Sequence, residues 1–255
     1  MRQDERAPFV TGLQQARIAA YPPGQFVGQE SFMTAGDILT VARRAGIGPG
    51  VPVLDLCCGV AGPGRLVMEE LGCTYVGLDY SATAIDIARE RTGHLPARFE
   101  VARVPPLPAG PFAVVLLLET MLAFGDKQAL LREIARVLSP GGRLALTVEA
   151  GEPLTPAELA AMPDADTVHL IPLPDLRRLL EAVELRVRWE HECSASHLAV
   201  VDSLLHHVSV RADEIAAHVG QRAVQELLAA HGLWHDWLRS GRVRKFALVA
   251  EKVAG

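Results

Sequence analysis

The residues best suited to holding a ligand follow a buried, strand-like run near residue 53. The run Val53–Leu56 contains Asp55 and continues through Cys57, Gly59 and Gly64 toward a helix-like stretch. Small residues at such a turn let a ligand lie against the backbone. A glycine-rich turn alone is weak support for a ligand site, so the acidic residues around it decide its interpretation.

A second acidic residue points to a nucleoside ligand. Asp79, followed by Tyr80, ends the next strand-like run, where a carboxylate can accept hydrogen bonds from both ribose hydroxyls. A dinucleotide would place its pyrophosphate at the helix N-terminus, where Asp55 would repel it, whereas a ligand with an ammonium and a sulfonium would be attracted. The charges therefore favour S-adenosylmethionine over NAD.

Three side chains are candidates for acid–base chemistry. Glu119 follows the apolar run Val114–Leu118 and should point into a cleft beside the ligand; its alternative role is that of an acid stabilised by a helix start. His169 and His197 lie where the chain leaves the expected sheet, so either could act as a base or anchor a substrate. The alternative for both is an ordinary surface or packed histidine.

The elements around these residues alternate between short apolar runs and longer amphipathic ones, which is typical of a parallel sheet covered by helices. The sequence predicts seven strands and four helices, and we expect the segment after the third helix, 139–142, to turn the chain into the fifth strand. We expect residues 1–45 and the largely helical insertion 194–240 to form a substrate cap on a domain spanning 46–255, although a plain cover of the sheet or a dimer contact is an equal alternative. The strands are expected at 51–56, 74–78, 98–102, 113–118, 143–148, 185–192 and 242–249, and the helices at 62–71, 81–92, 126–138 and 174–183.

Three motifs, VLDLCCGVAGPG, GLD and LSPGGRLAL, follow one another along the chain. Together they resemble the motifs of the class I S-adenosylmethionine-dependent methyltransferases. Among these, the chain is most similar to small-molecule enzymes of the sarcosine/dimethylglycine and ubiquinone-biosynthesis type. The resemblance implies a doubly wound, Rossmann-like α/β sheet of order 3-2-1-4-5-7-6 with strand 7 antiparallel and a helical cap. It further implies that an N-terminal residue such as Tyr21 or Gln29 closes the cofactor site, unless this turn is solvated and Tyr21 packs on the core.

Two positions depart from the pattern of that family. In the motif DxGxGxG, Cys57 and Ala61 replace two glycines, and both are small. Arg103 occupies the place of an Asp that commonly binds the adenine amino group, and an arginine has no acceptor for that bond. Adenine would then be held by backbone groups, by stacking or by a neighbouring residue.

Composition excludes several other functions. The 255 residues carry 25 Lys+Arg against 30 Asp+Glu, a net charge of −5, which argues against nucleic-acid binding. The longest apolar run is far shorter than the roughly 18 residues of a membrane span, and the charged N-terminus lacks an export signal, so we expect a cytoplasmic protein with reduced cysteines. No metal-ligand spacing is evident. The basic residues near the C-terminus, Arg239, Arg242, Arg244 and Lys245, are interpreted as a solvated edge strand, with binding of an anionic acceptor as the alternative.

The sequence therefore predicts a methyltransferase that transfers a methyl group to nitrogen, oxygen or carbon of a small molecule by in-line displacement. An enzyme of this kind needs a base only when the acceptor arrives protonated. A non-methylating cyclase that keeps the cofactor as a structural group is the alternative, and a degenerate scaffold is less consistent with the two retained acids. Neither the acceptor nor a homodimer can be assigned from the residues alone.

Overall fold

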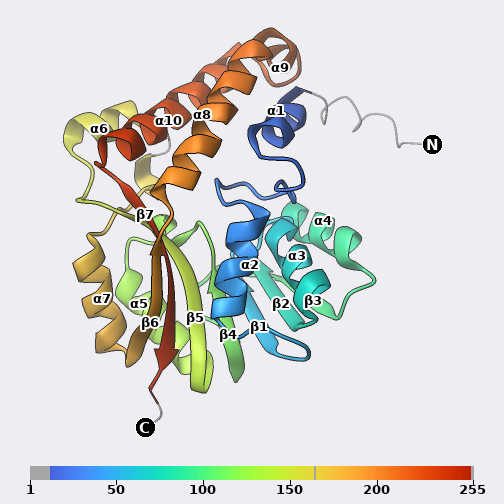
Figure 1. Ribbon diagram of the computed structural model, residues 1–255, viewed down its shortest axis with the longest axis vertical. Coiled ribbons are helices and arrows are strands. Elements are labelled where there is room, and N and C mark those ends of the chain that lie inside the picture. Colours follow the sequence, from blue (N-terminus) through green and yellow to red (C-terminus); the bar gives the residue numbers. More distant parts are fainter. Residues whose placement is uncertain (1–11, 164, 254–255) are drawn as a thin grey trace.

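The computed structural model describes residues 12–163 and 165–253, which form a seven-stranded sheet flanked by helices (Figure 1). The strand order is β3-β2-β1-β4-β5-β7-β6. The strands are β1 (Pro52–Leu56), β2 (Thr74–Asp79), β3 (Ala97–Val101), β4 (Phe112–Leu117), β5 (Leu138–Ala150), β6 (Leu185–Glu192) and β7 (Arg244–Lys252).

The direction of the strands confirms the predicted fold class and strand order. Strands β1 to β5 pair in parallel, and β7 runs antiparallel between β5 and β6. Because parallel strands need crossover connections, helices must cover both faces of such a sheet. The carboxyl ends of β1, β2 and β4 therefore meet at one edge, where ligands bind in folds of this kind.

Two helical layers bury the faces of the sheet. Helices α5 (Lys127–Val137) and α7 (Leu173–Ala182) cover one face, where Leu130, Leu131 and Ile134 of α5 are fully buried. Burying a side chain of this size contributes ~1.5–3 kcal/mol. Helices α2 (Ala35–Arg44), α3 (Gly62–Leu71) and α4 (Ala82–Thr92) cover the other face.

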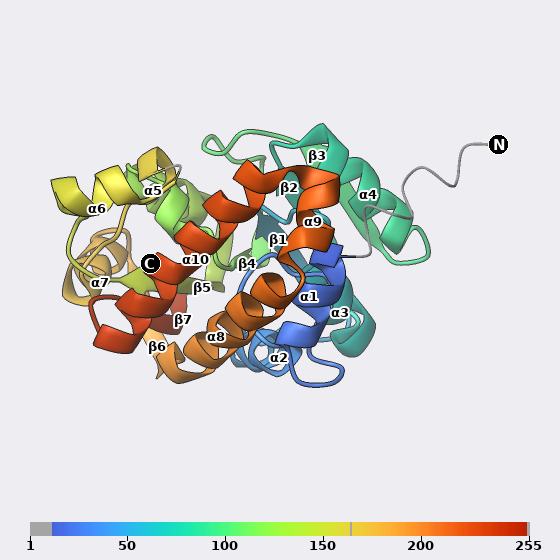
Figure 2. The ribbon, with the colours of Figure 1, turned by 90° about the horizontal axis from the view of Figure 1, so that it is seen from above.

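The segments outside the sheet form a separate layer above its carboxyl edge (Figures 1 and 2). Helix α1 (Gly12–Ala20) packs with α8 (Ser194–Val210), α9 (Ala212–Val219) and α10 (Gln221–Ser240) around their own apolar cluster. The two helices of the N-terminal segment lie in different places: α1 belongs to this upper layer, whereas α2 packs on a face of the sheet. Residues 1–11 of the expected cap lie outside the described residues.

Among the predicted elements, the start of β5 differs most from the prediction. Helix α5 ends at Val137 and β5 begins at Leu138, so residues 139–142 belong to the strand and are not a turn before it. Leu138 pairs with Phe112 before the register shifts. Three short elements complete the described part of the chain: α6 (Pro156–Ala161) and 3-10 turns at Met121–Ala123 and Ala165–Thr167.

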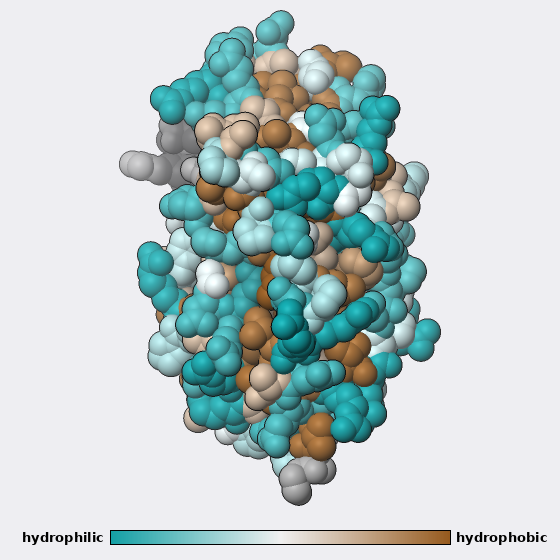
Figure 3. Space-filling view, turned by 90° about the vertical axis from the view of Figure 1, so that its left-hand side faces the viewer, coloured by the Kyte–Doolittle hydropathy of each residue, from teal (hydrophilic) through white to brown (hydrophobic). Residues whose placement is uncertain are grey.

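Polar side chains cover most of the face in Figure 3, and apolar side chains appear there in separate patches. Within residues 12–163 and 165–253, no helix is both long enough and apolar enough to cross a membrane. The same residues contain no group of three or more His, Cys, Asp or Glu side chains arranged to hold a metal ion.

Candidate functional site

The glycine-rich turn after β1 keeps a left-handed backbone even where glycine has been replaced. Cys57 has φ 60°, Gly59 φ 53° and Ala61 φ 56°. Nothing lies within 4 Å of the position that a Cβ of Gly59 would take, so this part of the turn is open to a ligand. Cys57 and Ala61 therefore preserve the shape of the turn at the cost of backbone strain, which for L-residues is about 1–2 kcal/mol each.

Two further glycines of the turn allow close packing. A Cβ on Gly62 would lie 2.6 Å from the backbone of Gly28, and one on Gly64 would lie 2.1 Å from the hydroxyl of Tyr75. The N-terminal loop therefore rests directly on the start of α3. Gly64 faces the protein interior, and its predicted contact with the cofactor stays a prediction.

Asp55 lies beneath the turn and is only 4% exposed. The hydroxyl of Tyr75 on β2 donates a hydrogen bond to its carboxylate. Burial raises the pKa of Asp55 to about 7, although the bond from Tyr75 acts in the opposite direction. The carboxylate is thus held by a buried tyrosine, and its expected attraction for a cationic ligand would act from below the turn.

Asp79 ties the end of β2 to the turn. Its Oδ2 accepts a hydrogen bond from the backbone N–H of Gly59 at 2.9 Å, and its Oδ1 accepts one from Ser81 at 2.9 Å. A carboxylate has about four lone-pair positions, so both oxygens can still accept from a ligand. The structure brings Asp79 and the open face of Gly59 together, as the sequence predicts.

Tyr80 and Arg103 lie beside each other next to Asp79. The guanidinium carbon of Arg103 is 5.4 Å from the centre of the Tyr80 ring, and 67% of Tyr80 is exposed. Arg103 therefore interacts with an aromatic face. This supplies a stacking surface at the place where an Asp is common in the resembled family.

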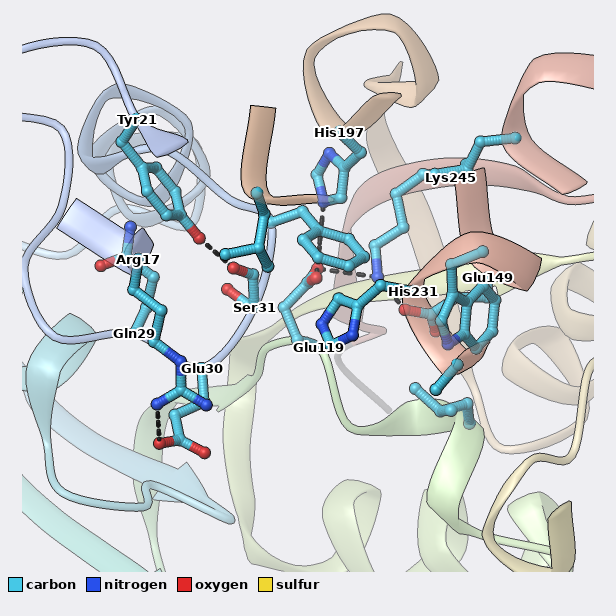
Figure 4. A pocket seen from close by; sticks show the side chains of 16 residues that line it. Arg17, Tyr21, Gln29, Glu30, Ser31, Glu119, Glu149, His197, His231 and Lys245 are labelled. Carbon is cyan, nitrogen blue, oxygen red and sulfur yellow. Dashed lines mark hydrogen bonds and ion pairs between the residues drawn. The ribbon is translucent and has the colours of Figure 1, made fainter. Parts of the chain in front are cut away.

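Two neighbouring cavities lie at the carboxyl edge of the sheet. We call the smaller one the turn cavity; it has a volume of about 150 Å³, and its lining includes Cys57, Gly59 and Gly62. The larger cap cavity, about 320 Å³, lies under the upper helical layer (Figure 4). Four residues line both cavities: Gln29, Glu30, Ser31 and Glu119.

Glu119 is held by a buried charge network between the two cavities. It follows β4 with φ 62°, and its backbone N–H donates to Thr147 Oγ1 at 2.6 Å. Lys245 Nζ lies 2.7 Å from Glu119 Oε1 and also donates to Glu149 on β5. Burial alone would raise the pKa of Glu119, but Lys245 and His197 hold it well below its usual range. Glu119 is therefore an ion-paired carboxylate and a poor proton acceptor.

His197 joins the upper layer to this network. Its Nδ1 lies 3.0 Å from the carbonyl oxygen of Cys193, and its Nε2 lies 3.4 Å from the carboxylate of Glu119. Both neighbours accept hydrogen bonds, so both ring nitrogens carry protons and the ring is cationic. Although burial acts against it, the charge of Glu119 raises the pKa of His197 to about 10. An imidazolium of this kind is an ion-pair partner and does not accept a proton near neutral pH.

Tyr21 and Gln29 both line the cap cavity, but their polar groups bind the N-terminal loop itself. The Tyr21 hydroxyl donates to the carbonyl of Ser31. The Gln29 amide donates to the carbonyls of Gln25 and Met33 at 3.0 and 2.8 Å. These bonds hold the loop against the mouth of the turn, and direct contact of either side chain with the cofactor stays a prediction.

His169 lies at another place in the fold. It is exposed and lines a separate cavity together with Lys127, whose ammonium donates to the His169 carbonyl oxygen at 2.6 Å. The structure therefore brings Glu119 and His197 together but does not bring His169 to them.

Three residues of the cap cavity were not expected to be functional from the sequence. Lys245 is only 1% exposed, so its assignment to a solvated edge strand is wrong; β7 lies between two strands and carries this side chain into the interior. Glu149 ends a buried strand, and His231 lies on α10 with Ala230 and Trp234 on the cavity side. The only available signal was the helical spacing of His231 and Trp234, which indicates one shared face.

Comparisons with known proteins agree with this arrangement. Residues 53–142 match the family described as a methyltransferase domain. The methyltransferase GfsG of Streptomyces halstedii is 34% identical over 120 residues, which cover 44% of this chain and 43% of that protein. The chain thus spans less than half the length of this relative.

Solved structures share the fold over most of the chain. A putative sarcosine dimethylglycine methyltransferase from Galdieria sulphuraria superimposes with a TM-score of 0.77 at 17% identity, covering 87% of this chain and 85% of that one. The [4+2]-cyclase SpnF superimposes with a TM-score of 0.74 at 19% identity, covering 98% and 95%. The resemblance predicted from the sequence is confirmed: residues 53–142 match a methyltransferase domain, and the chain shares the fold of these solved structures.

Proposed function

We propose that this chain binds S-adenosylmethionine at the glycine-rich turn and transfers its methyl group to a small-molecule acceptor held in the cap cavity. The observation that carries this proposal is the shared wall of the two cavities, formed by Gln29, Glu30, Ser31 and Glu119. A transfer enzyme must place cofactor and acceptor next to each other. Two adjoining cavities, one beside a nucleoside-binding turn, meet that requirement.

The residues around the turn fit the cofactor. The open face of Gly59 would take the methionine part of the molecule, and Asp79 would accept the ribose hydroxyls. Tyr80 and Arg103 offer a flat surface for adenine. When bound, S-adenosylmethionine supplies an electrophilic methyl group on a positively charged sulfur.

The network around Glu119 positions the reactants in this proposal and does not remove a proton. Lys245 and His197 keep the Glu119 carboxylate fixed and ionised between the two cavities. A carboxylate fixed in this way needs no reorganisation during the reaction. With both reactants bound, the upper helical layer would exclude water from this place, as transfer requires.

A cyclase that retains the cofactor is the second candidate, supported by the likeness to SpnF over 98% of this chain. The altered glycines gave a reason to doubt methyl transfer, but Cys57 and Ala61 keep left-handed backbone angles, and the turn retains its shape. Methyl transfer therefore remains the better supported function. The four free cysteines in the described part of the chain suit a reducing compartment such as the cytoplasm.

Calorimetry and isotope transfer together test the proposal. We expect S-adenosylmethionine and S-adenosylhomocysteine to bind the wild-type chain, and label from methyl-labelled cofactor to enter the small-molecule fraction of a cell extract. Asp79→Ala should weaken the binding and lower the transfer, whereas Asp86→Ala, which removes an exposed carboxylate paired with Arg89 on α4, should change neither. Binding without transfer would favour the cyclase, and absence of binding would refute both candidates.

A further inference from the structure

One basic side chain of the cap cavity has no ion-pair partner in the described part of the chain. The other charged groups of its lining occur in pairs: Arg17 with Glu30, Lys245 with Glu119 and Glu149, and His197 with Glu119. With His197 protonated, the paired groups comprise three cations and three carboxylates, so their charges cancel. His231 belongs to none of these pairs.

The ring of His231 is oriented by one hydrogen bond. Its Nδ1 lies 2.7 Å from the carbonyl oxygen of Leu227, one turn earlier on α10. A carbonyl oxygen only accepts hydrogen bonds, so Nδ1 carries the proton, and in the neutral ring Nε2 has a free lone pair. Among the described residues, no partner of Nε2 is found. Phe32 fixes the ring further, in an edge contact with 5.7 Å between ring centres.

The ring lines the cap cavity, whose wall also includes Glu119 and Lys245 (Figure 4). Burial lowers the pKa of His231, and the charge of Arg17 acts in the same direction, while the bond to Leu227 opposes them. The ring is therefore neutral near neutral pH and available as a proton acceptor. Glu149 Oε2 also lacks a partner, but this atom is itself enclosed.

We infer that His231 is the general base of this site and that the acceptor carries an ionisable hydroxyl group, as in a phenol or an enol. The inference rests on the proposed function for the identity of the second reactant. The acceptor O–H bond would break, with its proton going to His231 Nε2 and its electron pair staying on the oxygen. That oxygen would then form a bond to the methyl carbon while the bond from this carbon to the cofactor sulfur breaks, and the electron pair of the broken bond would stay on the sulfur. The resulting imidazolium returns its proton to solvent.

The charge balance and lining of the cavity favour a neutral hydroxyl over an ammonium group. Each cavity-lining carboxylate is already paired, so a buried cation would find no free counter-charge and would lose its hydration. A neutral O–H group needs one acceptor only, which Nε2 supplies. The body of the acceptor would lie against the apolar side chains of the lining, Phe32, Leu122, Leu204, Trp234 and Leu238.

Nitrogen NMR of selectively labelled histidine tests the state of His231 without any cofactor. We expect a neutral ring protonated on Nδ1, with a pKa below the ordinary value of 6.5. Adding 4-nitrophenol should change the chemical shift of Nε2 in the direction expected when this nitrogen accepts a hydrogen bond. The matched probe 4-nitroanisole, which has no O–H, should bind without that change.

Two phenylalanine variants complete the test. His231→Phe keeps a ring of similar size and should lose the preference for 4-nitrophenol over 4-nitroanisole. His235→Phe, one turn later on α10 and outside the cavity lining, should retain it. A charged His231 at neutral pH, an equal response to both probes, binding of neither, or an unchanged preference in His231→Phe would overturn the inference. Cofactor binding measured on the same variants tests the proposed function separately.

Discussion

Lys245→Met tests the buried charge network, because it removes one cation and leaves two carboxylates. Lys245 is 1% exposed and contacts both Glu119 and Glu149. Removing one partner from a buried ion pair costs about 3–5 kcal/mol, since the remaining charge is uncompensated. At about 2.1 cal/mol/K of unfolding entropy per residue, 255 residues give about 0.5 kcal/mol/K. The variant should therefore melt about 6–9 °C below the wild type.

Differential scanning calorimetry measures this difference, and Arg244→Met supplies the control. Arg244 is the preceding residue on β7, but its ion pair with Glu192 is exposed, so its loss should lower the melting temperature much less. Equal melting temperatures for the two variants would refute the argument that burial gives the network its strength. Adding Glu149→Gln to Lys245→Met should recover part of the loss, because it removes one of the stranded charges.

The difference in stability between the wild type and Lys245→Met should depend on pH in a definite direction. The pKa of Glu119 lies below its unfolded value of 4.5, so its contribution is present above that pH and is lost on acidification. The pKa of Lys245 lies above its unfolded value of 10.5, so its contribution is present below that pH and is lost in stronger base. The wild type should exceed Lys245→Met in stability most strongly between these two values. A difference that is constant across acid pH would contradict this assignment.

Three other predictions concern residues outside the network. Because burial raises the pKa of Asp55 from 3.8 to about 7, ionising it opposes folding, so stability should fall as the pH rises through that interval; urea titrations should show less of this fall in Asp55→Asn. Asp79→Ala should weaken S-adenosylhomocysteine binding by about 1.5–3 kcal/mol in calorimetry, through loss of charge-assisted bonds, and unchanged affinity in the folded variant would exclude ribose binding at this residue. Glu184→Gly, at φ 60° just after α7, should raise the unfolding free energy by about 0.5–1 kcal/mol, and a lower urea midpoint would contradict the strain argument.

The sheet was predictable because its strands are local apolar runs bounded by turns, whereas their order came from the resemblance to a family. The start of β5 was missed because residues 139–142 have the composition of a turn, and only pairing of Leu138 with Phe112 reveals the strand. The position of Asp79 was predictable as well, because this residue ends one of these local apolar runs. Local composition thus identified the turn and its acids.

The cap cavity was harder to predict because its walls come from distant segments. Lys245 is charged within a run of basic residues, and nothing near it in sequence indicates that Glu119 and Glu149 lie beside it. His231 is one of nine histidines, and its free nitrogen depends on the orientation of α10 above the sheet. The surroundings of Lys245 and of His231 are determined by tertiary packing, which the periodic pattern of apolar residues in the sequence does not encode.

The cap cavity is lined partly by residues of the sheet and partly by residues of α10, and substitutions in these two parts should have different effects on stability. Glu119, Glu149 and Lys245 lie on or directly after sheet strands and are joined by buried ion pairs, so altering any one of them leaves an unpaired charge and destabilises the fold. His231 and Trp234 lie on α10, where partly exposed side chains can be exchanged at a smaller cost in stability. Acceptor specificity should therefore be changed through α10, and substitutions in the floor of the cavity should first affect folding. Comparing the melting temperatures of Trp234→Phe and Glu149→Gln would test this difference directly.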